Sequence, residues 1–438
     1  MKGFFNWLNK TRIFRDLSPQ EFSWVLYDVG NSAYTMLACS LIPIWFKNIA
    51  IGTNPGQISG DNATAYYSMA ISITTIIVAL IGPVIGTLAD HKDRRKVLFN
   101  TVVALGVMLC VANGFVNAWL PFLIIFVLTR IFYTSANMIY DSMLNDVTTE
   151  ERSDQVSSYG YAWGYIGSCI PFILAMVAYI LSGGLSEDLM FFSPKVGRII
   201  GFAITGIWWL IVTIPLIKNY KQVNYVEAHK GDVARVFGKI FGTLKRIATQ
   251  DKKVLLFLIA FFMYIDGVGT IIDNCINIGT DLGLPTVGQV VFLLATQVVA
   301  FAGSLVFARL SKKYRTVTLI LICIVGYFFV CIYALTLKNL LDFGILAFGV
   351  GCFQGSIQSL SRSYFSKIIP PANSGEYFGI YDIFAKGASF LGSAVIAAVK
   401  LAGGTINIAV ASISIFFLLG FVFLMLADKQ PLAAGARE

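Results

Sequence analysis

Charged side chains lie inside stretches of this chain that are otherwise apolar. Asp28 stands near the start of the first such stretch, Arg130 and Asp266 fall near the middle of later ones, and Lys386 lies inside another. Burying a charge in hydrocarbon costs about 3 kcal/mol or more, so such residues usually face water or a partner. An Arg can grip a carboxylate through two hydrogen bonds and an Asp can bind an ammonium, so Arg130 with Asp266 suits a zwitterion such as an amino acid. The alternative is that these two side chains pair with each other.

The stretches around these charges identify an integral membrane protein. The chain has 438 residues, of which 57% are hydrophobic and 13% charged, and its mean hydropathy of +0.74 exceeds that of soluble proteins. Apolar runs of about 20 residues recur from end to end, each long enough to cross a bilayer as a helix. We therefore predict an all-α fold of twelve membrane spans, at 24–46, 66–89, 97–117, 120–141, 157–181, 196–217, 253–274, 288–309, 316–336, 341–361, 377–399 and 405–427.

The longest polar stretch divides the spans into six and six. This predicts an N-terminal six-helix bundle at 1–217, a linker at 218–252 and a C-terminal six-helix bundle at 253–438. Apolar residues recur at three- and four-residue steps from Val233 to Ile247, with lysines and arginines between them, which predicts an amphipathic helix on the membrane surface. A solvated linker is the alternative.

Basic residues are distributed unevenly between the two predicted faces. Of the 33 lysines and arginines, 26 lie on one face and 5 on the other, and basic loops stay in the cytoplasm. We therefore expect both termini to be cytoplasmic. The same asymmetry accounts for the net charge of +9, so we expect the lipid bilayer and no nucleic acid as a partner. The seven cysteines fall within predicted spans without metal-type spacing, so we expect no metal and no cofactor.

The two halves resemble each other in sequence. The segment GPVIGTLADHKDRRKVL, from Gly82, aligns without a gap on GSLVFARLSKKYRTVTL, from Gly303, which matches Arg94 with Arg315. Weak internal repeats of this kind are typical of transporters in which two similar bundles rock around a site between them.

With these features the chain resembles the major facilitator superfamily. The segment GTLADHKDRRK is similar to the signature of that superfamily between spans two and three, except that His91 replaces a basic residue and Asp93 a glycine. A narrower resemblance, to the bacterial relatives of fungal vacuolar amino-acid effluxers linked to autophagy, lies in WVLYDVGNSAYT, FFMYIDGVGTI, GCFQGSIQSLSRSYFSKIIP and EYFGIYDIFAKGASFLGS.

The resemblance implies a gate on the cytoplasmic side. Gly86 would allow close helix approach, Asp90 would face the N-terminal end of a neighbouring helix, and the basic residues would pair with carboxylates after span four, such as Asp146. Charges near the cytoplasmic ends of spans 1, 4, 10 and 11 form a second candidate gate. The gating candidates are Gly86, Asp90, Arg94, Arg95, Lys96, Asp146, Asp28, Asp141, Arg362, Asp382 and Lys386.

The resemblance also places spans 1, 4, 7 and 10 around a central cavity. Their polar residues are the candidates for substrate binding: Tyr27, Asn31, Arg130, Asn137, Tyr140, Tyr264, Asp266, Asp273, Asn274, Gln354 and Gln358. No ATP-binding phosphate loop is visible and both histidines lie in loops, so Asp28 or Asp266 is the candidate proton carrier.

These features predict a secondary transporter and not an enzyme. We expect a monomer of the bacterial plasma membrane that moves a small polar or zwitterionic solute, such as an amino acid, by alternating access, in the export direction and coupled to protons. An exporter of lipophilic drugs or lipids is one alternative. The other is a membrane receptor that has a transporter fold and transports nothing.

Overall fold

The computed structural model describes residues 16–52, 56–227, 236–387 and 390–432. Within these ranges the chain is nearly all helical and contains no β-strand, so the predicted all-α class is confirmed. The N-terminal bundle consists of α2 (Pro19–Cys39), α3 (Leu41–Ala50), α4 (Gly60–Ala89), α5 (Arg94–Asn113), α6 (Trp119–Ser142), α7 (Leu144–Val147), α8 (Glu150–Ile180), the short helix η1 (Glu187–Leu189) and α9 (Pro194–Asn219).

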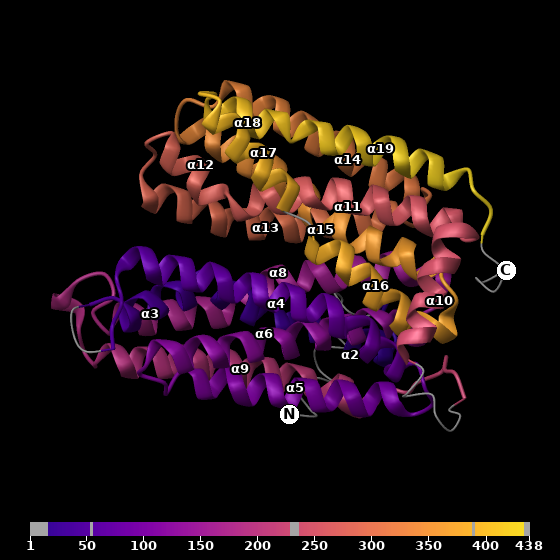
Figure 1. The fold of residues 1–438 in the computed structure, drawn as a ribbon, viewed down its shortest axis with the longest axis horizontal. Coiled ribbons are helices and arrows are strands. Elements are labelled where there is room, and N and C mark those ends of the chain that lie inside the picture. Colours follow the sequence, from indigo (N-terminus) through magenta and orange to yellow (C-terminus); the bar gives the residue numbers. More distant parts are fainter. Residues whose placement is uncertain (1–15, 53–55, 228–235, 388–389, 433–438) are drawn as a thin grey trace.

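The C-terminal bundle follows a linker helix, α10 (Val236–Thr249). It consists of α11 (Lys252–Asp273), α12 (Cys275–Asp281), α13 (Thr286–Leu310), α14 (Thr316–Tyr333), η3 (Ala334–Thr336), α15 (Leu340–Ile368), η4 (Pro371–Asn373), α16 (Ser374–Gly387), α17 (Phe390–Leu401), α18 (Ile406–Ser412) and α19 (Ser414–Asp428). Figure 1 shows the two bundles one above the other, in indigo to magenta and in salmon to yellow.

Ten of the described helices are long and apolar enough to cross a membrane, and the bent pair α2 and α3 makes an eleventh span. The first predicted span is therefore not one straight helix, because its axis turns by 41° at Ser40. The predicted span at 377–399 corresponds to α16 and α17, which flank residues outside the described ranges.

Polar residues at the helix starts explain where several helices begin. Ser18 and Glu21 form a reciprocal capping box at the start of α2, in which each side chain accepts a hydrogen bond from the backbone N–H of the other residue. Asn339 caps α15 by accepting from Leu341 and Asp342. Asp93, just before α5, has φ of 60°, a left-handed conformation. The superfamily signature has glycine at this position because glycine adopts that conformation without strain.

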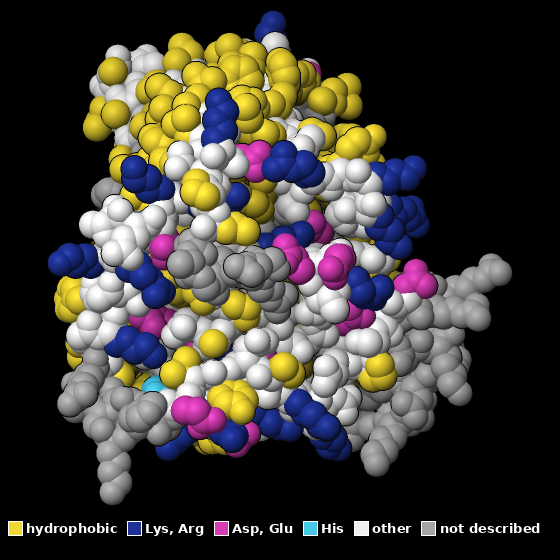
Figure 2. Space-filling model, turned by 90° about the vertical axis from the view of Figure 1, so that its right-hand side faces the viewer, with side chains coloured by type: hydrophobic (Ala, Val, Ile, Leu, Met, Phe, Trp, Pro, Cys, Tyr) yellow, Lys and Arg dark blue, Asp and Glu magenta, His cyan; other side chains and the backbone are white. Residues whose placement is uncertain are grey.

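The bundles touch through a few helices only. Across the interface α8 packs against α13 and α15, and α4 packs against α16. In Figure 1 the ribbons meet at the end that carries α10 and α16 and diverge toward the end that carries α3 and α12. We call the first the basic end, because Lys and Arg side chains are spread over it in Figure 2, and the second the far end.

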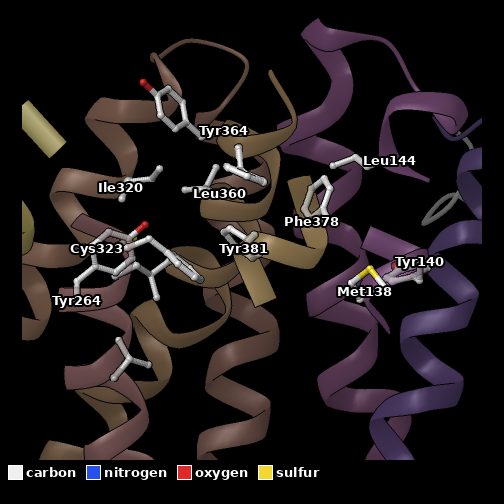
Figure 3. Close-up of a cluster of buried hydrophobic side chains, with 14 of the residues drawn as sticks. Met138, Tyr140, Leu144, Tyr264, Ile320, Cys323, Leu360, Tyr364, Phe378 and Tyr381 are labelled. Atoms are coloured by element: carbon white, nitrogen blue, oxygen red, sulfur yellow. The ribbon is translucent and has the colours of Figure 1, made fainter. Parts of the chain in front are cut away.

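The apolar core is continuous between the bundles at the basic end. One cluster of buried side chains contains residues of both bundles, among them Met138, Leu144, Leu360 and Phe378, and Figure 3 shows Phe378 directed toward Leu144 across the interface. The buried members of a second cluster, which includes Trp45 and residues of α3, come from the N-terminal bundle alone. The two bundles are therefore in apolar contact at the basic end.

The predicted amphipathic helix is present as α10, although residues 228–235, including Val233, lie outside the described ranges. Val236, Ile240 and Ile247 are buried, whereas Phe237 and Phe241 are exposed. The helix contacts α4 of one bundle and α11 of the other. Its placement on a membrane surface stays a prediction.

Candidate functional site

Arg362 of α15 crosses from the C-terminal bundle into the N-terminal one. Its side chain is 3% exposed, and its Nη1 and Nη2 lie 2.9 Å from Asp141 Oδ1 and 3.2 Å from Asp28 Oδ2. Its Nε donates to Ser157 Oγ at 3.0 Å and its Nη2 donates to the Ser157 carbonyl at 3.1 Å. Arg362 and the two carboxylates, all three of them gating candidates, thus meet in one buried cluster. The cluster joins α2, α6, α8 and α15.

Aromatic rings enclose the same guanidinium. Its carbon lies 4.5 Å from the ring centre of Trp24, 4.6 Å from that of Tyr161 and 5.4 Å from that of Tyr140. Tyr140 also donates to Asp28 at 2.9 Å. Such cation–π contacts strengthen when water is excluded. We call Arg362, Asp28, Asp141 and the three rings the Arg362 cage.

A glycine makes room for the cage. A Cβ atom on Gly160 would lie 2.4 Å from Asp28 Oδ2 and 3.2 Å from Arg362 Nη2, so any larger residue would displace this contact. The close contact between α8 and the cage therefore depends on glycine at this position.

The two partners of the shorter ion pair of the cage occupy equivalent places in the two bundles. The last residues of α4 and α13, at 89 and 310, are 221 positions apart, and so are the first residues of α6 and α15, at 119 and 340. Asp141 and Arg362 are separated by the same 221 positions. The ion pair therefore joins matching positions of the internal repeat.

A second set of contacts across the bundles surrounds Asp90. Its carboxylate accepts from the backbone N–H groups of Gly375 at 2.7 Å and Glu376 at 2.9 Å, at the start of α16, where a helix attracts negative charge. Arg95 lies 2.6 Å from Asp90 and 2.7 Å from Asp146. Burial raises the pKa of Asp90 to about 6, while Arg95 and the two N–H groups act in the opposite direction. The ion pair with Arg95 and the two N–H donors thus stabilise the charged form of this carboxyl.

Close backbone contact permits this arrangement. A Cβ on Gly86 would lie 2.1 Å from the Gly375 carbonyl oxygen, and one on Gly375 would lie 2.5 Å from that of Gly86. Helices α4 and α16 therefore approach each other as closely as only glycine permits.

The first part of the linker is fastened to the N-terminal bundle. Asp146 accepts from Tyr220 Oη at 2.5 Å and from the Asn224 N–H at 2.8 Å. Burial raises the pKa of Tyr220 well above its usual value, so the hydroxyl keeps its proton and can donate it. Lys96 reaches the Tyr220 carbonyl at 3.1 Å, whereas Arg94 is exposed.

The sequence interpretation missed a polar seam between α8 and α15. Asp154 pairs with Lys367 at 2.8 Å and accepts from Ser363 at 2.5 Å. Ser157 donates to the Ser359 carbonyl at 2.7 Å. The signal was present, because Ser153 and Ser157 recur at the helical spacing and so do Ser359 and Ser363. Ser153 and Ser363, however, lie outside the spans predicted at 157–181 and 341–361.

Of the residues of α2 that were predicted to bind substrate, Tyr27 lies beside Asp28 of the cage and Asn31 lies three residues farther toward the far end. Asn137 accepts from both Tyr27 and Asn31 at 3.0 Å. On the same face of α2, Asn31 is buried and Thr35 and Cys39 are exposed. This face therefore becomes accessible toward the far end.

Arg130 of α6 belongs to this more open region. Its side chain is half-buried, and among the described residues its recorded contact is with the Phe126 ring, at 5.7 Å from the ring centre. Cys39 lies within electrostatic range of Arg130 and of Asp273, which is exposed at the end of α11. A guanidinium of one bundle and a carboxylate of the other thus both act electrostatically on this part of α2.

The structure does not bring Asp266 against Arg130. Asp266 is fully buried and accepts from Gly392 N–H at 3.0 Å and Thr270 Oγ1 at 3.2 Å. It therefore lies within the C-terminal bundle in this conformation, and Asp273 is the exposed carboxylate of α11.

The remaining candidates of the C-terminal bundle are dispersed. Tyr264 is buried and shares a hydrogen bond of 2.6 Å with Ser361, and Asn274 donates to the Thr270 carbonyl at 2.9 Å. Gln354 is buried, and Gln358 donates to its carbonyl at 3.2 Å. Asp382 lies within electrostatic range of Asp141, and the side chain of Lys386 lies outside the described part.

Comparison with known proteins agrees with this architecture. Residues 19–432 match the family described as vacuole effluxer Atg22 like. The Bacillus subtilis (strain 168) protein named as an uncharacterized MFS-type transporter, YxiO, is 38% identical over 416 residues, which cover 94% of this chain and 96% of that protein. Autophagy-related protein 22-1 of Neosartorya fischeri is 25% identical over 304 residues, which are 64% of this chain and 48% of the fungal protein. The matched region thus spans about half of that fungal relative.

Solved structures share the fold. The major facilitator transporter FucP in the outward conformation gives a TM-score of 0.72 at 15% identity, over 94% of this chain and 99% of FucP. The proton:xylose symporter XylE gives 0.73 at 13% identity, over 93% and 95% of the two chains. Because the family match covers nearly the whole chain and the Bacillus relative matches it almost end to end, this chain belongs to the Atg22-like effluxer family within the major facilitator superfamily of transporters.

Proposed function

We propose that this transporter moves a small polar or zwitterionic solute, such as an amino acid, by alternating access. The observation that carries the proposal is Arg130, a half-buried guanidinium on α6 for which the described residues supply no ion pair and no hydrogen bond. An Arg inside a membrane span without a carboxylate partner is costly unless water reaches it. A carboxylate supplied by the solute would provide that partner through two parallel hydrogen bonds.

The surroundings of Arg130 support a polar cargo over a lipophilic one. Asp273 could bind the ammonium of the same solute, and the amides of Asn31 and Asn137 lie between this region and the cage. Binding between groups of both bundles would favour closure of the far end around the solute.

The Arg362 cage is proposed as the gate at the basic end and Asp28 as the proton carrier. Opening this end would separate Arg362 from Asp28 and Asp141 and admit water to both carboxylates. Export is supported by the description of the family as effluxers, and proton coupling by the symporter XylE, which shares the fold. We also propose that the basic end faces the cytoplasm of a bacterial cell, in keeping with the Lys and Arg side chains spread over it.

A thermal-shift screen of amino acids on the purified chain tests the substrate class. A solute present at about 100 times its Kd stabilises the protein by about 2.7 kcal/mol. We expect the hits to lose this effect in Arg130→Ala and to keep it in Arg309→Ala, a matched control because Arg309 is exposed at the basic end. Hits that stabilise Arg130→Ala as much as the unaltered chain would exclude Arg130 as the contact.

Transport in proteoliposomes tests the coupling. We expect a pH gradient to drive accumulation of the solute by the unaltered chain, whereas Asp28→Asn keeps solute exchange but loses the response to the gradient. If transport by the unaltered protein ignores pH and moves no protons, proton coupling is wrong.

A further inference from the structure

A small pocket lies at the basic end of the C-terminal bundle, apart from the cage and from Arg130. Its volume is ≈ 270 Å³, compared with ≈ 680 Å³ for the hollow around Asp16, and it lies where α11 and α14 begin and α15 and α19 end. Lys253, Arg315 and Lys367 line it, together with Tyr364, Glu150 and Asp428. Three cations from three helices thus surround one hollow.

The hydroxyl of Tyr364 is the group in this pocket that most directly indicates a ligand. The residue is 6% exposed, and its hydroxyl is buried without a hydrogen-bond partner among the described residues. Figure 3 shows the ring at the edge of the apolar cluster, with the oxygen directed away from Leu360 and Cys323. Leaving a buried hydroxyl unsatisfied costs about 1–3 kcal/mol, so an acceptor in the pocket would remove this cost.

The start of α14 adds further donors. Helix α14 begins at Thr316, and its N-cap residue Arg315 makes no side-chain capping hydrogen bond. The first N–H groups of a helix have no partner inside it and attract anions. Because Thr316 and Val317 line the pocket, this uncapped end faces the same hollow as Tyr364.

The matching place in the N-terminal bundle already contains an anion. Arg95 and Thr316 are separated by 221 positions, as are Asp146 and Lys367. In the N-terminal bundle Asp146 accepts from Arg95 and from Tyr220 Oη. In the C-terminal bundle Lys367 donates to Thr316 instead, at 2.9 Å. The repeat thus replaces the built-in carboxylate by an ammonium and leaves a tyrosine hydroxyl without an acceptor.

We propose that this pocket binds a phosphate group, either inorganic phosphate or the phosphate of a lipid headgroup. Its oxygens would accept from Tyr364 Oη, from Arg315 and from Lys253, whose ammonium uses one donor on the Gln430 carbonyl at 3.1 Å. Arginine and lysine are the residues that recognise phosphate most often.

The two carboxylates of the pocket do not prevent this binding. Asp428 pairs with Arg315 at 2.7 and 3.1 Å, an exposed contact in which Arg315 retains other donors. Glu150 lies at the start of α8, on the opposite bundle, and it is exposed. Lys367 is already paired with Asp154, so Lys253 and Arg315 are the cations of the lining that would bind the phosphate.

Bound phosphate would also favour the closed basic end. Glu150 belongs to the N-terminal bundle, and Lys367 pairs with Asp154 of the same bundle. The pocket therefore has its present shape only while the bundles are in contact, and a ligand that binds one conformation shifts the population toward it.

Thermal unfolding of the full chain in detergent, with sodium phosphate titrated at constant ionic strength, tests the proposal. Phosphate stabilises many proteins by exclusion from their surface. Binding in the pocket is therefore judged by comparing the phosphate response of variants with that of the unaltered chain. We expect Tyr364→Phe and Arg315→Ala each to weaken the saturable response roughly tenfold or more. In phosphate-free buffer Tyr364→Phe should be at least as stable as the unaltered chain, since it removes an unsatisfied hydroxyl.

Two variants serve as controls. Tyr327→Phe removes another buried hydroxyl that has no partner among the described residues, but Tyr327 does not line the pocket. Lys313→Ala removes an exposed charge of the same loop. Both should respond to phosphate like the unaltered chain.

The source of the phosphate is decided by a second arm. Mixed micelles with phosphatidylglycerol, compared with micelles that contain an uncharged glycolipid, should stabilise the chain through Tyr364 and Arg315 if the ligand is a lipid headgroup. A response to free phosphate alone identifies the inorganic ion. If neither probe gives a saturable response, or if Tyr364→Phe and Arg315→Ala respond like the two controls, the pocket is not a phosphate site.

Discussion

The ion pairs of Arg362 with Asp28 and Asp141 can form and break reversibly. Closing the cage removes one guanidinium and two carboxylates from water, and this desolvation offsets much of the attraction between them. Breaking the contact without admitting water would leave unpaired buried charges, which costs about 3–5 kcal/mol. The cage is therefore stable when closed and dry or open and wet, and unstable between these states.

A charge swap tests the cage at the level of single residues. Asp141→Arg and Arg362→Asp each place like charges together, so we expect each to open the basic end and lower thermal stability, by about 3–5 kcal/mol. The double variant should recover a large part of the loss. Opening is measured as the alkylation rate of a cysteine introduced at Ser359, which is buried between α8 and α15.

The control is the ion pair of Lys400 and Asp281, in which Lys400 Nζ lies 2.5 Å from Asp281 Oδ2. The two side chains are 43% and 39% exposed. Swapping these two charges should change stability by less than about 1 kcal/mol. A double cage variant as impaired as its single variants would show that charge pairing does not hold the gate.

Asp93 offers a test of local strain. Its φ of 60° costs a non-glycine residue about 1 kcal/mol, although Asp tolerates this conformation better than most. We expect Asp93→Gly to be neutral or to stabilise the chain by up to about 1 kcal/mol, and Asp93→Val to destabilise it. The midpoint of thermal unfolding measures both, and a marked loss of stability in Asp93→Gly would contradict the strain argument.

The residue types predicted some partners and not others. Opposite charges near the ends of spans 1, 4 and 10 suggested contacts among Asp28, Asp141 and Arg362, and the structure brings these three together. Depth along a helix does not give the direction of a side chain, and so Asp266 was grouped with Arg130 as a substrate contact although it lies between α11 and α17. The rings of the cage come from positions that look like ordinary core residues in sequence.

Helix type and order followed from the apolar runs, whereas helix ends and bends did not. The first span was drawn as one helix, but Pro43 lacks an N–H and its ring would crowd the Cys39 carbonyl four residues earlier. The chain breaks at Ser40 accordingly. The start of α8 was predicted at 157, whereas the helix begins at Glu150. A prediction from hydropathy leaves polar helical turns out of a span, even where the second bundle supplies their hydrogen-bond partners.

The crossing of α4 and α16 can be tested as an element. Because a Cβ on Gly86 would lie 2.1 Å from the Gly375 carbonyl oxygen, we expect Gly86→Ala to separate the helices and to raise the alkylation of the Ser359→Cys reporter. Gly238→Ala in α10 is the control, since nothing lies within 4 Å of the Cβ it would add, and it should leave the reporter protected. Equal protection in both variants would show that this close approach does not hold the basic end closed.

At the scale of the whole molecule, one closed end implies that the other is accessible. Among the seven cysteines Cys39 is the exposed one, and the others are buried or intermediate. We therefore expect a membrane-impermeant maleimide, added outside intact cells, to label Cys39, and Cys39→Ser to lose most of the labelling. In Gly86→Ala, which should favour opening of the basic end, labelling should fall.

The same experiment tests the orientation of the chain. Labelling of Cys39 only after the cells are permeabilised would place the far end in the cytoplasm and overturn the topology expected from the basic residues.

The 221-residue relation between Asp141 and Arg362 also bears on the origin of the protein. An ancestor assembled from two identical six-helix subunits would bring the same side chain from each subunit to this point, and two equal charges there would repel. Opposite charges became available only once both units were encoded in a single gene and could accumulate different mutations. On this account the ion pair is younger than the duplication, and it marks the step after which neither unit could be exchanged for the other.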